Sequence, residues 1–142
     1  MPLEVGKTFY KQKISLNKII ITIILFLTAC SSGVKPDLLI GKWQYVSYEY
    51  QNKSLNKPLA NIAAQQPYIV FNANGTATIY SSGKVLSSGN YTLDGKVIRY
   101  VEDLPNNQKR KIPFLIRKLE TKKLVFQTMD SEVKVITAEK EK

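Results

Sequence analysis

Short β-strand-like segments separated by tight turns make up most of the chain after residue 40, and this pattern constrains the fold most strongly. In the clearest segment, 68–80, β-branched and aromatic residues flank Asn74-Gly75. Asn-Gly between two such runs predicts a β-hairpin, because both residues tolerate a positive φ. Asp94-Gly95 predicts a second hairpin, and Ser81-Ser82-Gly83 predicts the turn between the two. Consecutive hairpins of this kind build an antiparallel sheet.

Extending the same analysis to the C-terminus predicts eight strands joined mostly by short turns. The longer connection, 51–66, contains a stretch, 59–64, that predicts one or two helical turns. Pro113 restricts its strand to an edge, a bulge or a strand start, and Gly89 is expected at a bulge. A meander of eight strands can close into a barrel, which removes the exposed edges of the sheet. The expected strands are 41–50, 67–73, 76–81, 85–93, 96–101, 111–119, 123–129 and 132–138.

Alternation of apolar and polar residues predicts which side chains point into the barrel, although a slip of one residue in any strand would exchange its two faces. In the first strand Trp43 and Tyr45 share one face, and Tyr48 and Tyr50 share the other unless a bulge switches the face. The inward side chains either fill the barrel at normal core density or leave a pocket. The expected inward set is Trp43, Ile69, Phe71, Ile79, Tyr91, Leu93, Ile98, Tyr100, Phe114, Ile116, Leu124, Phe126, Val133 and Val135.

The N-terminal segment has the organisation of a secretory signal peptide. A basic stretch with four lysines precedes the apolar run Ile19–Leu27, which is about half as long as a membrane-spanning helix requires. Leu27-Thr28-Ala29-Cys30 resembles the lipobox of bacterial lipoproteins. The resemblance implies cleavage between Ala29 and Cys30 and attachment of lipid to Cys30, the only cysteine of the chain. Two or more acyl chains anchor a protein stably to a membrane.

The expected organisation is a signal peptide at 1–29, a lipidated N-terminus and tether at 30–38, and a barrel domain at 39–142. Ser31, rather than aspartate, follows Cys30. By analogy with the sorting rule of well-studied Gram-negative bacteria, this residue favours the outer membrane, with the domain in the periplasm. The expected location is therefore the cell envelope, through a lipid on Cys30.

Composition excludes several function classes. The 142-residue chain has no histidine and one cysteine, so the usual general base, an internal disulfide and cysteine-based metal sites are absent. No catalytic group, metal or cofactor is expected, and we interpret the protein as a non-enzyme. The chain carries a formal charge of +10, but secretion separates it from nucleic acid. Its basic group could meet anionic lipid headgroups or form an ordinary solvated face; it comprises 109–111, 117–118 and 122–123.

Three segments resemble lipocalin-like proteins. Gly41-Lys42-Trp43 matches the Gly-x-Trp signature at the start of lipocalins, and 68–76 and 89–95 resemble the YITFNADGT and GTYTLDG stretches of small lipocalin-like lipoproteins of Bacteroidota. The resemblance spans 39–137 and implies an all-β, eight-stranded, up-and-down barrel. Lipocalins commonly have a late arginine that packs over the tryptophan. Here the nearest cations are Lys134 and Lys140.

The resemblance implies binding or carriage of a small hydrophobic ligand inside the barrel. Strands of about seven residues tilted by about 40° give a wall only about 18 Å high, which is short for a deep pocket. Two alternatives stay open: a packed barrel that acts as a protein-interaction or structural module, and an inhibitor of an envelope enzyme. No protein partner can be named. The expected ligand-lining residues are Trp43, Phe71, Tyr91, Tyr100, Phe114 and Phe126.

Overall fold

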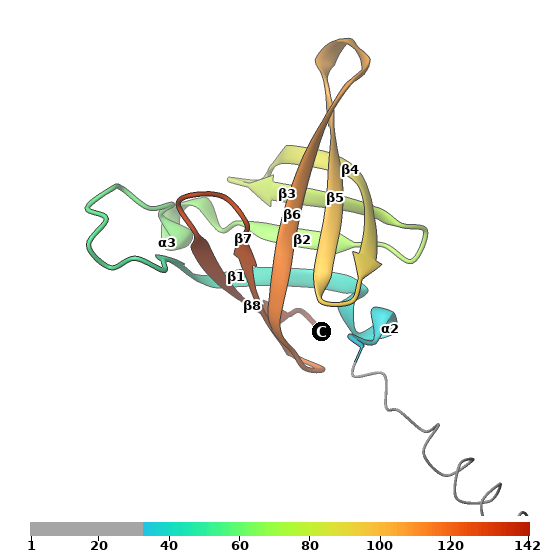
Figure 1. The fold of residues 1–142 in the computed structure, drawn as a ribbon, viewed down its shortest axis with the longest axis horizontal. Helices are drawn as coiled ribbons and strands as arrows, with labels where there is room; N and C mark the ends of the chain where they lie inside the picture. The colour runs from blue at the N-terminus through green and yellow to red at the C-terminus, as the bar shows by residue number, and fades with distance from the viewer. Residues whose placement is uncertain (1–32) are drawn as a thin grey trace, which may run out of the picture. The chain divides into compact units, whose positions relative to one another are not determined.

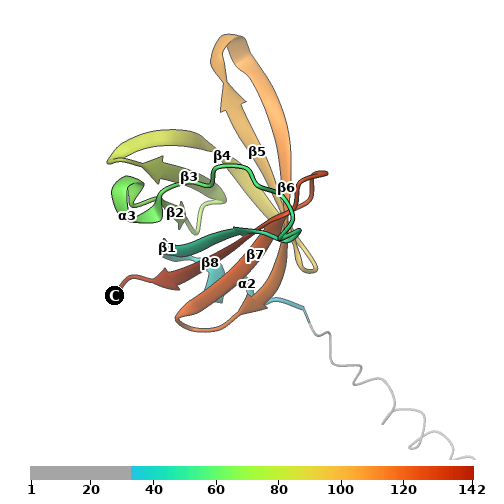
Figure 2. The same cartoon turned by 90° about the vertical axis from the view of Figure 1, so that its left-hand side faces the viewer.

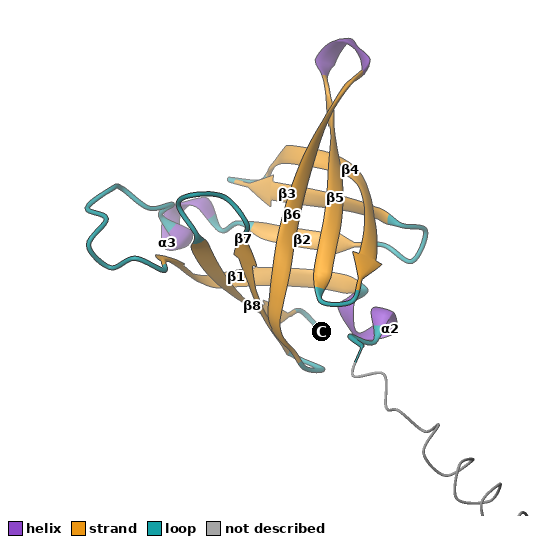
Figure 3. Ribbon diagram, in the orientation of Figure 1, coloured by secondary structure: helices purple, strands orange, loops and turns teal. Residues whose placement is uncertain are grey.

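The computed structural model describes residues 33–142, and the expectations for the signal peptide and Cys30 lie outside this range. The segment Gly33–Lys142 is one compact unit. Each strand pairs antiparallel with the next, and the last pairs with the first, so the expected closed eight-stranded barrel is confirmed (Figures 1 and 3). Its elements are α2 (Pro36–Leu39), β1 (Gly41–Tyr50), α3 (Ile62–Gln65), β2 (Tyr68–Phe71), β3 (Thr76–Ser81), β4 (Lys84–Asp94), β5 (Val97–Leu104), a 3₁₀ turn (Pro105–Asn107), β6 (Gln108–Leu119), β7 (Lys123–Thr128) and β8 (Lys134–Lys140).

All eight strands of the closed barrel and the cluster of buried residues inside it belong to the described unit Gly33–Lys142. None of the helices in the described part is long and apolar enough to cross a bilayer. The helical turn expected at 59–64 occurs slightly later, as α3. The side chain of Asn61 caps it by accepting a hydrogen bond from the amide of Ala64.

The hairpin of β5 and β6 is longer than the expected strands and projects beyond the rest of the barrel (Figures 1 and 2). Opposite charges face each other across the added pairs, Glu102 with Arg110 and Asp103 with Lys109, and form ion pairs. These pairs continue the ladder up to the 3₁₀ turn Pro105–Asn107. β6 begins at Gln108 and is flanked by β5 and β7, so the expectation of an edge or a strand start at Pro113 was wrong. The proline is tolerated because it precedes the β6–β7 ladder, which begins at Phe114.

The turn at Asn74-Gly75 differs from the expectation that both residues have a positive φ. Only Gly75 has a positive φ, of 82°. The amide of Gly75 donates to the carbonyl of Asn72 at 3.1 Å and closes a four-residue turn. Gly75, the last residue of this turn, adopts the left-handed conformation. By contrast, Ser82 and Gly83 both have positive φ, of 52° and 73°, and join β3 to β4 as a two-residue turn.

A bulge in β1 decides which side chains of the first strand point inward. The register with β8 shifts between Tyr45 and Ser47, and Val46 is exposed. Tyr48 therefore returns to the inner face, opposite buried Ile136. The bulge that the sequence left as an alternative is confirmed, and Tyr45 and Tyr48 both contribute to the interior.

In β8 the inward residues differ from the expectation. Val133 precedes the strand and Val135 is only half-buried, whereas Ile136 and Ala138 are buried. The assignment of the two valines was wrong because both faces of this strand carry apolar residues, so alternation alone cannot orient it. Pairing decides instead: Ile136 lies opposite Phe126, and directly paired residues share a face of the sheet.

Trp43 forms the floor of the barrel. Its side chain is fully buried, and its indole Nε1 donates to the carbonyl of Leu39 in α2 at 2.7 Å. The ammonium of Lys140 lies 5.1 Å from the centre of the ring and donates to the carbonyl of Leu38 at 3.0 Å. Lys140, rather than Lys134, thus occupies the place over the tryptophan.

Gly89 permits close contact between β4 and β5. No register shift occurs there, so the expected bulge was wrong: β3–β4 slips between Ile79 and Tyr80 instead. A Cβ on Gly89 would lie 2.0 Å from the carbonyl oxygen of Val101. Only glycine lets the two backbones approach this closely.

We predict that Gly89→Ala strongly destabilises the barrel. The added methyl meets backbone atoms of β5, which cannot move without breaking the ladder, so the free energy of unfolding should fall by about 3 kcal/mol. Gly83→Ala is the matched control: nothing lies within 4 Å of its Cβ, and only its positive φ is strained, at roughly 1 kcal/mol. Urea unfolding of residues 33–142 measures both, and equal losses would contradict the prediction.

Candidate functional site

The two ends of the barrel are built differently. The α2 end carries α2, the C-terminus and the turns β2–β3, β4–β5 and β6–β7. The α3 end carries the loop 51–67 with α3 and the turns β3–β4, β5–β6 and β7–β8 (Figure 1). Trp43 and Leu39, both fully buried, fill the α2 end. Any opening into the barrel must therefore be sought at the α3 end.

The six expected ligand-lining residues all lie on the inner face. Five are buried and Tyr91 is half-buried. Tyr91 donates its hydroxyl proton to the carbonyl of Asn72 at 3.0 Å, near the α2 end. The prediction that the six residues bind a ligand stays a prediction. The buried five are Trp43, Phe71, Tyr100, Phe114 and Phe126.

Aromatic rings fill the middle of the barrel. Phe126 packs edge-to-face on Phe114 and on Tyr45, with ring centres 5.5 and 5.9 Å apart. The ring of Tyr100 lies 6.4 Å from that of Phe114. These residues contact one another rather than surrounding a space, which is how a packed core is built.

Above the aromatic rings lies a polar group, Glu102 with Arg110, that was not among the expected site residues. Glu102 is only 5% exposed, and its Oε2 accepts a charge-assisted hydrogen bond from Nε of Arg110 at 2.7 Å and forms an ion pair with Nη2 of Arg110 at 2.6 Å. The Arg110 side chain remains 60% exposed. The sequence does hold a signal for this pair, because the two residues are nearly equidistant from the turn 105–107 and carry opposite charges.

Tyr100 extends the polar group into the barrel. Its hydroxyl lies 2.7 Å from the hydroxyl of Ser87 on β4. Burial raises the pKa of Tyr100, and the hydrogen bond from Ser87 offsets only part of this effect. Burial also raises the pKa of Tyr45 and of Tyr48. These phenols therefore stay neutral near pH 7 and can both donate and accept hydrogen bonds.

Half-buried apolar side chains stand beside the polar group. Ile79 and Ile112 pack against the core. Ile112 pairs with Tyr100, and Ile79 pairs with Ser87, so the apolar and polar groups share one face of neighbouring strands. The α3 end thus combines an apolar wall with a buried ion pair and hydroxyls. Within the described residues no cluster of three or more His, Cys, Asp or Glu could hold a metal.

Three hollows open on the outside or rim of the barrel. One of about 420 Å³ lies over β4, β5 and β6, and its lining includes Tyr91 and Tyr100, two of the expected ligand-lining residues, beside Arg99, Lys111 and Pro113. One of about 500 Å³ lies between the loop at Gln51 and the β7–β8 turn, and one of about 450 Å³ lies beside Tyr68. None of these three is lined by Glu102 or Arg110. The ring contacts favour a filled barrel middle.

Comparison with known families identifies the barrel. Residues 39–126, more than half of the chain, match the model of the lipocalin-like domain. The chain belongs to the lipocalin-like domain family. In this family member the late cation over the tryptophan is Lys140.

One solved structure is similar to the lipocalin-like domain. It is the crystal structure of apo Caenorhabditis elegans lipid binding protein 8, with a TM-score of 0.47 and 19% sequence identity over 76% of this chain and 99% of that one. Comparison with curated proteins gives no match.

We predict that the buried tyrosines make the lipocalin-like domain sensitive to alkali. Burial raises the folded-state pKa of Tyr45 above its usual value of 10.0. The contribution of this pKa shift to the free energy of unfolding is therefore complete below pH 10 and is lost as the pH rises further. Tyr45→Phe should leave the free energy of unfolding nearly unchanged at pH 7. At pH 11 the variant should be more stable than the parent by roughly 1 kcal/mol. Urea unfolding at both pH values checks this prediction. Equal free energies of unfolding for the variant and the parent at pH 11 would refute it.

Proposed function

We propose that this lipocalin-like protein is a lipid-anchored, non-enzymatic component of a bacterial cell envelope that binds a small hydrophobic or amphipathic molecule at the α3 end of its barrel. One observation carries the proposal: a carboxylate buried inside the barrel, Glu102, is held by an arginine, Arg110, that remains accessible from outside.

A buried carboxylate is costly to the fold. Taking the charge of Glu102 out of water costs several kcal/mol, and a buried ion pair is often no more stable than apolar residues of the same volume. Stability therefore gives little reason for this pair at the edge of an apolar interior, whereas recognition of a polar group does. Arg110 donates from Nε to Glu102 and holds Nη2 at ion-pair distance from it, which leaves other N–H groups of the guanidinium for a ligand.

The apolar wall suits the rest of such a ligand. Ile79 and Ile112 are half-buried and pair with Ser87 and Tyr100 of the polar group, so a bound molecule can cover apolar surface while its polar end meets Arg110. The aromatic cluster below them limits how deep the molecule can sit. An eight-stranded barrel has room for its own side chains or for one small ligand, and the filled middle favours a small, shallowly bound one.

The lipid anchor rests on the sequence. The lipobox-like Leu27-Thr28-Ala29-Cys30 places the only cysteine at the junction of a basic, apolar leader and the barrel domain. A diacylated or triacylated Cys30 holds a domain stably on a membrane. Ser31 favours the outer membrane, and we place the barrel on its periplasmic side. The resemblance to small lipoproteins of Bacteroidota supports a bacterial source.

A second candidate function is a protein-interaction module. The filled barrel middle supports it, as do two exposed apolar residues on β4: Val85 and Leu86 are 59% and 68% exposed. A module of this kind needs no ligand site, so ligand titration separates the two candidates.

We predict that a fluorescent fatty-acid analogue binds residues 33–142 with one-to-one stoichiometry and that Arg110→Gln weakens binding about tenfold or more. The variant removes a charge-assisted hydrogen bond, which contributes about 1.5–3 kcal/mol. The emission of the probe itself is the appropriate signal, because Trp43 lies at the opposite end of the barrel.

Lys109→Gln is the matched control. It removes one charge from the next residue, whose ion-pair partner Asp103 is exposed on the hairpin, and should leave binding unchanged. Urea unfolding establishes that each variant is folded. If the folded domain binds no probe, or if the two variants bind equally well, the site at the α3 end is wrong and the interaction module is favoured.

We predict that Cys30→Ala releases the protein from membranes. Without the thiol no thioether lipid can form, so the protein should move from washed membranes to the soluble fraction and incorporate no labelled fatty acid. Ser31→Ala, which keeps the thiol, should remain membrane-bound. Labelled fatty acid in the Cys30→Ala protein, or its retention in washed membranes, would contradict the anchor.

A further inference from the structure

Exposed positive charge is concentrated at the α2 end of the barrel. Exposed cations without an ion-pair partner among residues 33–142 lie at this end: one precedes α2, one lies in the β4–β5 turn, three lie near the β6–β7 turn, and one is C-terminal. They are Lys35, Lys96, Arg117, Lys122, Lys123 and Lys142. At the α3 end the corresponding cations are Lys84 and Lys111 alone.

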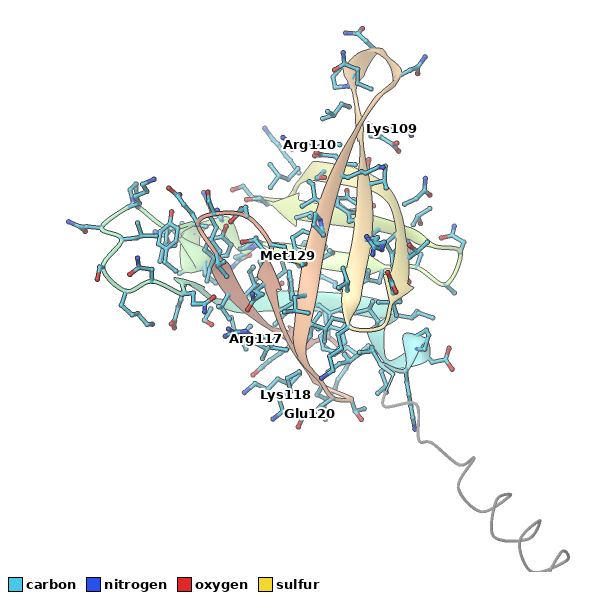
Figure 4. The ribbon with its side chains drawn as sticks, in the orientation of Figure 1. Lys109, Arg110, Arg117, Lys118, Glu120 and Met129 are labelled. Carbon is cyan, nitrogen blue, oxygen red and sulfur yellow. The ribbon has the colours of Figure 1, made fainter. Side chains whose placement is uncertain are left out.

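Basic residues that are close in sequence separate in the fold. Lys109 and Arg110 lie on the projecting hairpin, whereas Arg117 and Lys118 lie at the other end of β6 and point away from the barrel (Figure 4). The hairpin cations are neutralised by Asp103 and Glu102. The expected single basic group is therefore two groups, and the one at the α2 end is the less neutralised.

Carboxylates reduce but do not cancel the charge of the α2 end. Asp94, Glu120 and Glu141 are each engaged by a cation of the same end. Asp37 and Glu139 have no ion pair among the described residues. At the α3 end every carboxylate is ion-paired, those of Glu49, Glu102, Asp103, Asp130 and Glu132.

The chain enters the domain at this same end. The described residues begin at Gly33, immediately before α2, and Cys30 is three positions earlier in the sequence. Three residues span at most about 11 Å. A lipid on Cys30 therefore keeps the α2 end within reach of the headgroups, at a separation close to the distance of about 10 Å over which charges act in dilute salt.

We propose that the α2 end is a membrane-docking surface, in which Lys35, Lys96, Arg117, Lys122, Lys123 and Lys142 bind the anionic headgroups of the bilayer that holds the anchor. The orientation rests on the proposed lipid anchor, whereas the recognition of anionic headgroups is a property of residues 33–142 alone. Docking fixes the barrel upright, with α2 and the β6–β7 turn against the membrane and the projecting hairpin away from it.

The test is co-sedimentation of residues 33–142, which lack Cys30, with vesicles of equal parts phosphatidylglycerol and phosphatidylcholine. We expect binding in low salt, loss of binding in about 0.5 M sodium chloride, and little binding to pure phosphatidylcholine. Arg117→Gln/Lys122→Gln should lower the partition coefficient roughly 30-fold, at about fivefold for each cation near an anionic surface.

Lys84→Gln/Lys111→Gln is the matched control, since it removes the same charge from the α3 end and should change binding less than threefold. Both double variants alter exposed residues, and urea unfolding checks that they remain folded. Equal losses in the two variants would mean that net charge, not the α2 end, drives binding, and would overturn the proposal. Absence of binding to anionic vesicles would also overturn it, without bearing on lipidation of Cys30, which the fractionation experiment tests separately.

Discussion

The pairing of β1 with β8 is the constraint on which the rest of the structure depends. It closes the sheet, so no edge strand remains open along this seam. The pairing is regular from Trp43 to Tyr45, shifts at Val46 and continues from Ser47 to Tyr50. Without the shift, alternation from Trp43 and Tyr45 would place Ser47 on the inner face and Tyr48 on the solvent face. The bulge thus lets one strand supply the floor of the barrel through Trp43 and part of its upper wall through Tyr48.

Closure also determines how the interior is divided. Near α2, the indole of Trp43 is held by Leu39 on one side and covered by Lys140 on the other, so the last residue of β8 seals the end at which β1 begins. Above it the rings of Phe114 and Phe126 pack against each other. Apolar packing ends where Glu102 enters the barrel. The interior therefore changes from a packed core to a site with hydrogen-bonding groups over the length of one strand pair.

Much of the fold could be predicted from the sequence, because turn residues and alternation act locally. The eight strands and the turns between them followed from such signals. The orientation of β8 did not, because Val135 and Ile136 are both apolar and only pairing with Phe126 separates them. Gly89 was assigned to a bulge because a sequence does not show which backbone passes close to a glycine. That contact, with Val101, depends on the coiling of the whole sheet.

The candidate site was harder to predict than the fold for a related physical reason. Large aromatic residues attract attention as ligand contacts, yet in a narrow barrel they are also the side chains that fill it best, as Phe126 and Phe71 do. The group that distinguishes a site from a core is polar and buried, and burial of Glu102 follows from the extended β5–β6 pairing rather than from any local motif.

The two proposed surfaces have compatible positions. Consecutive hairpins place the turns of an up-and-down barrel alternately at its two ends, so the α2 end, with its uncompensated cations, lies opposite the α3 end, with Glu102 and Arg110. With the α2 end on the membrane, the α3 end opens toward the aqueous side. A ligand would then enter from solution rather than directly from the bilayer. The aromatic cluster leaves only a shallow depth for a ligand. This limit on ligand size does not depend on how the domain is oriented.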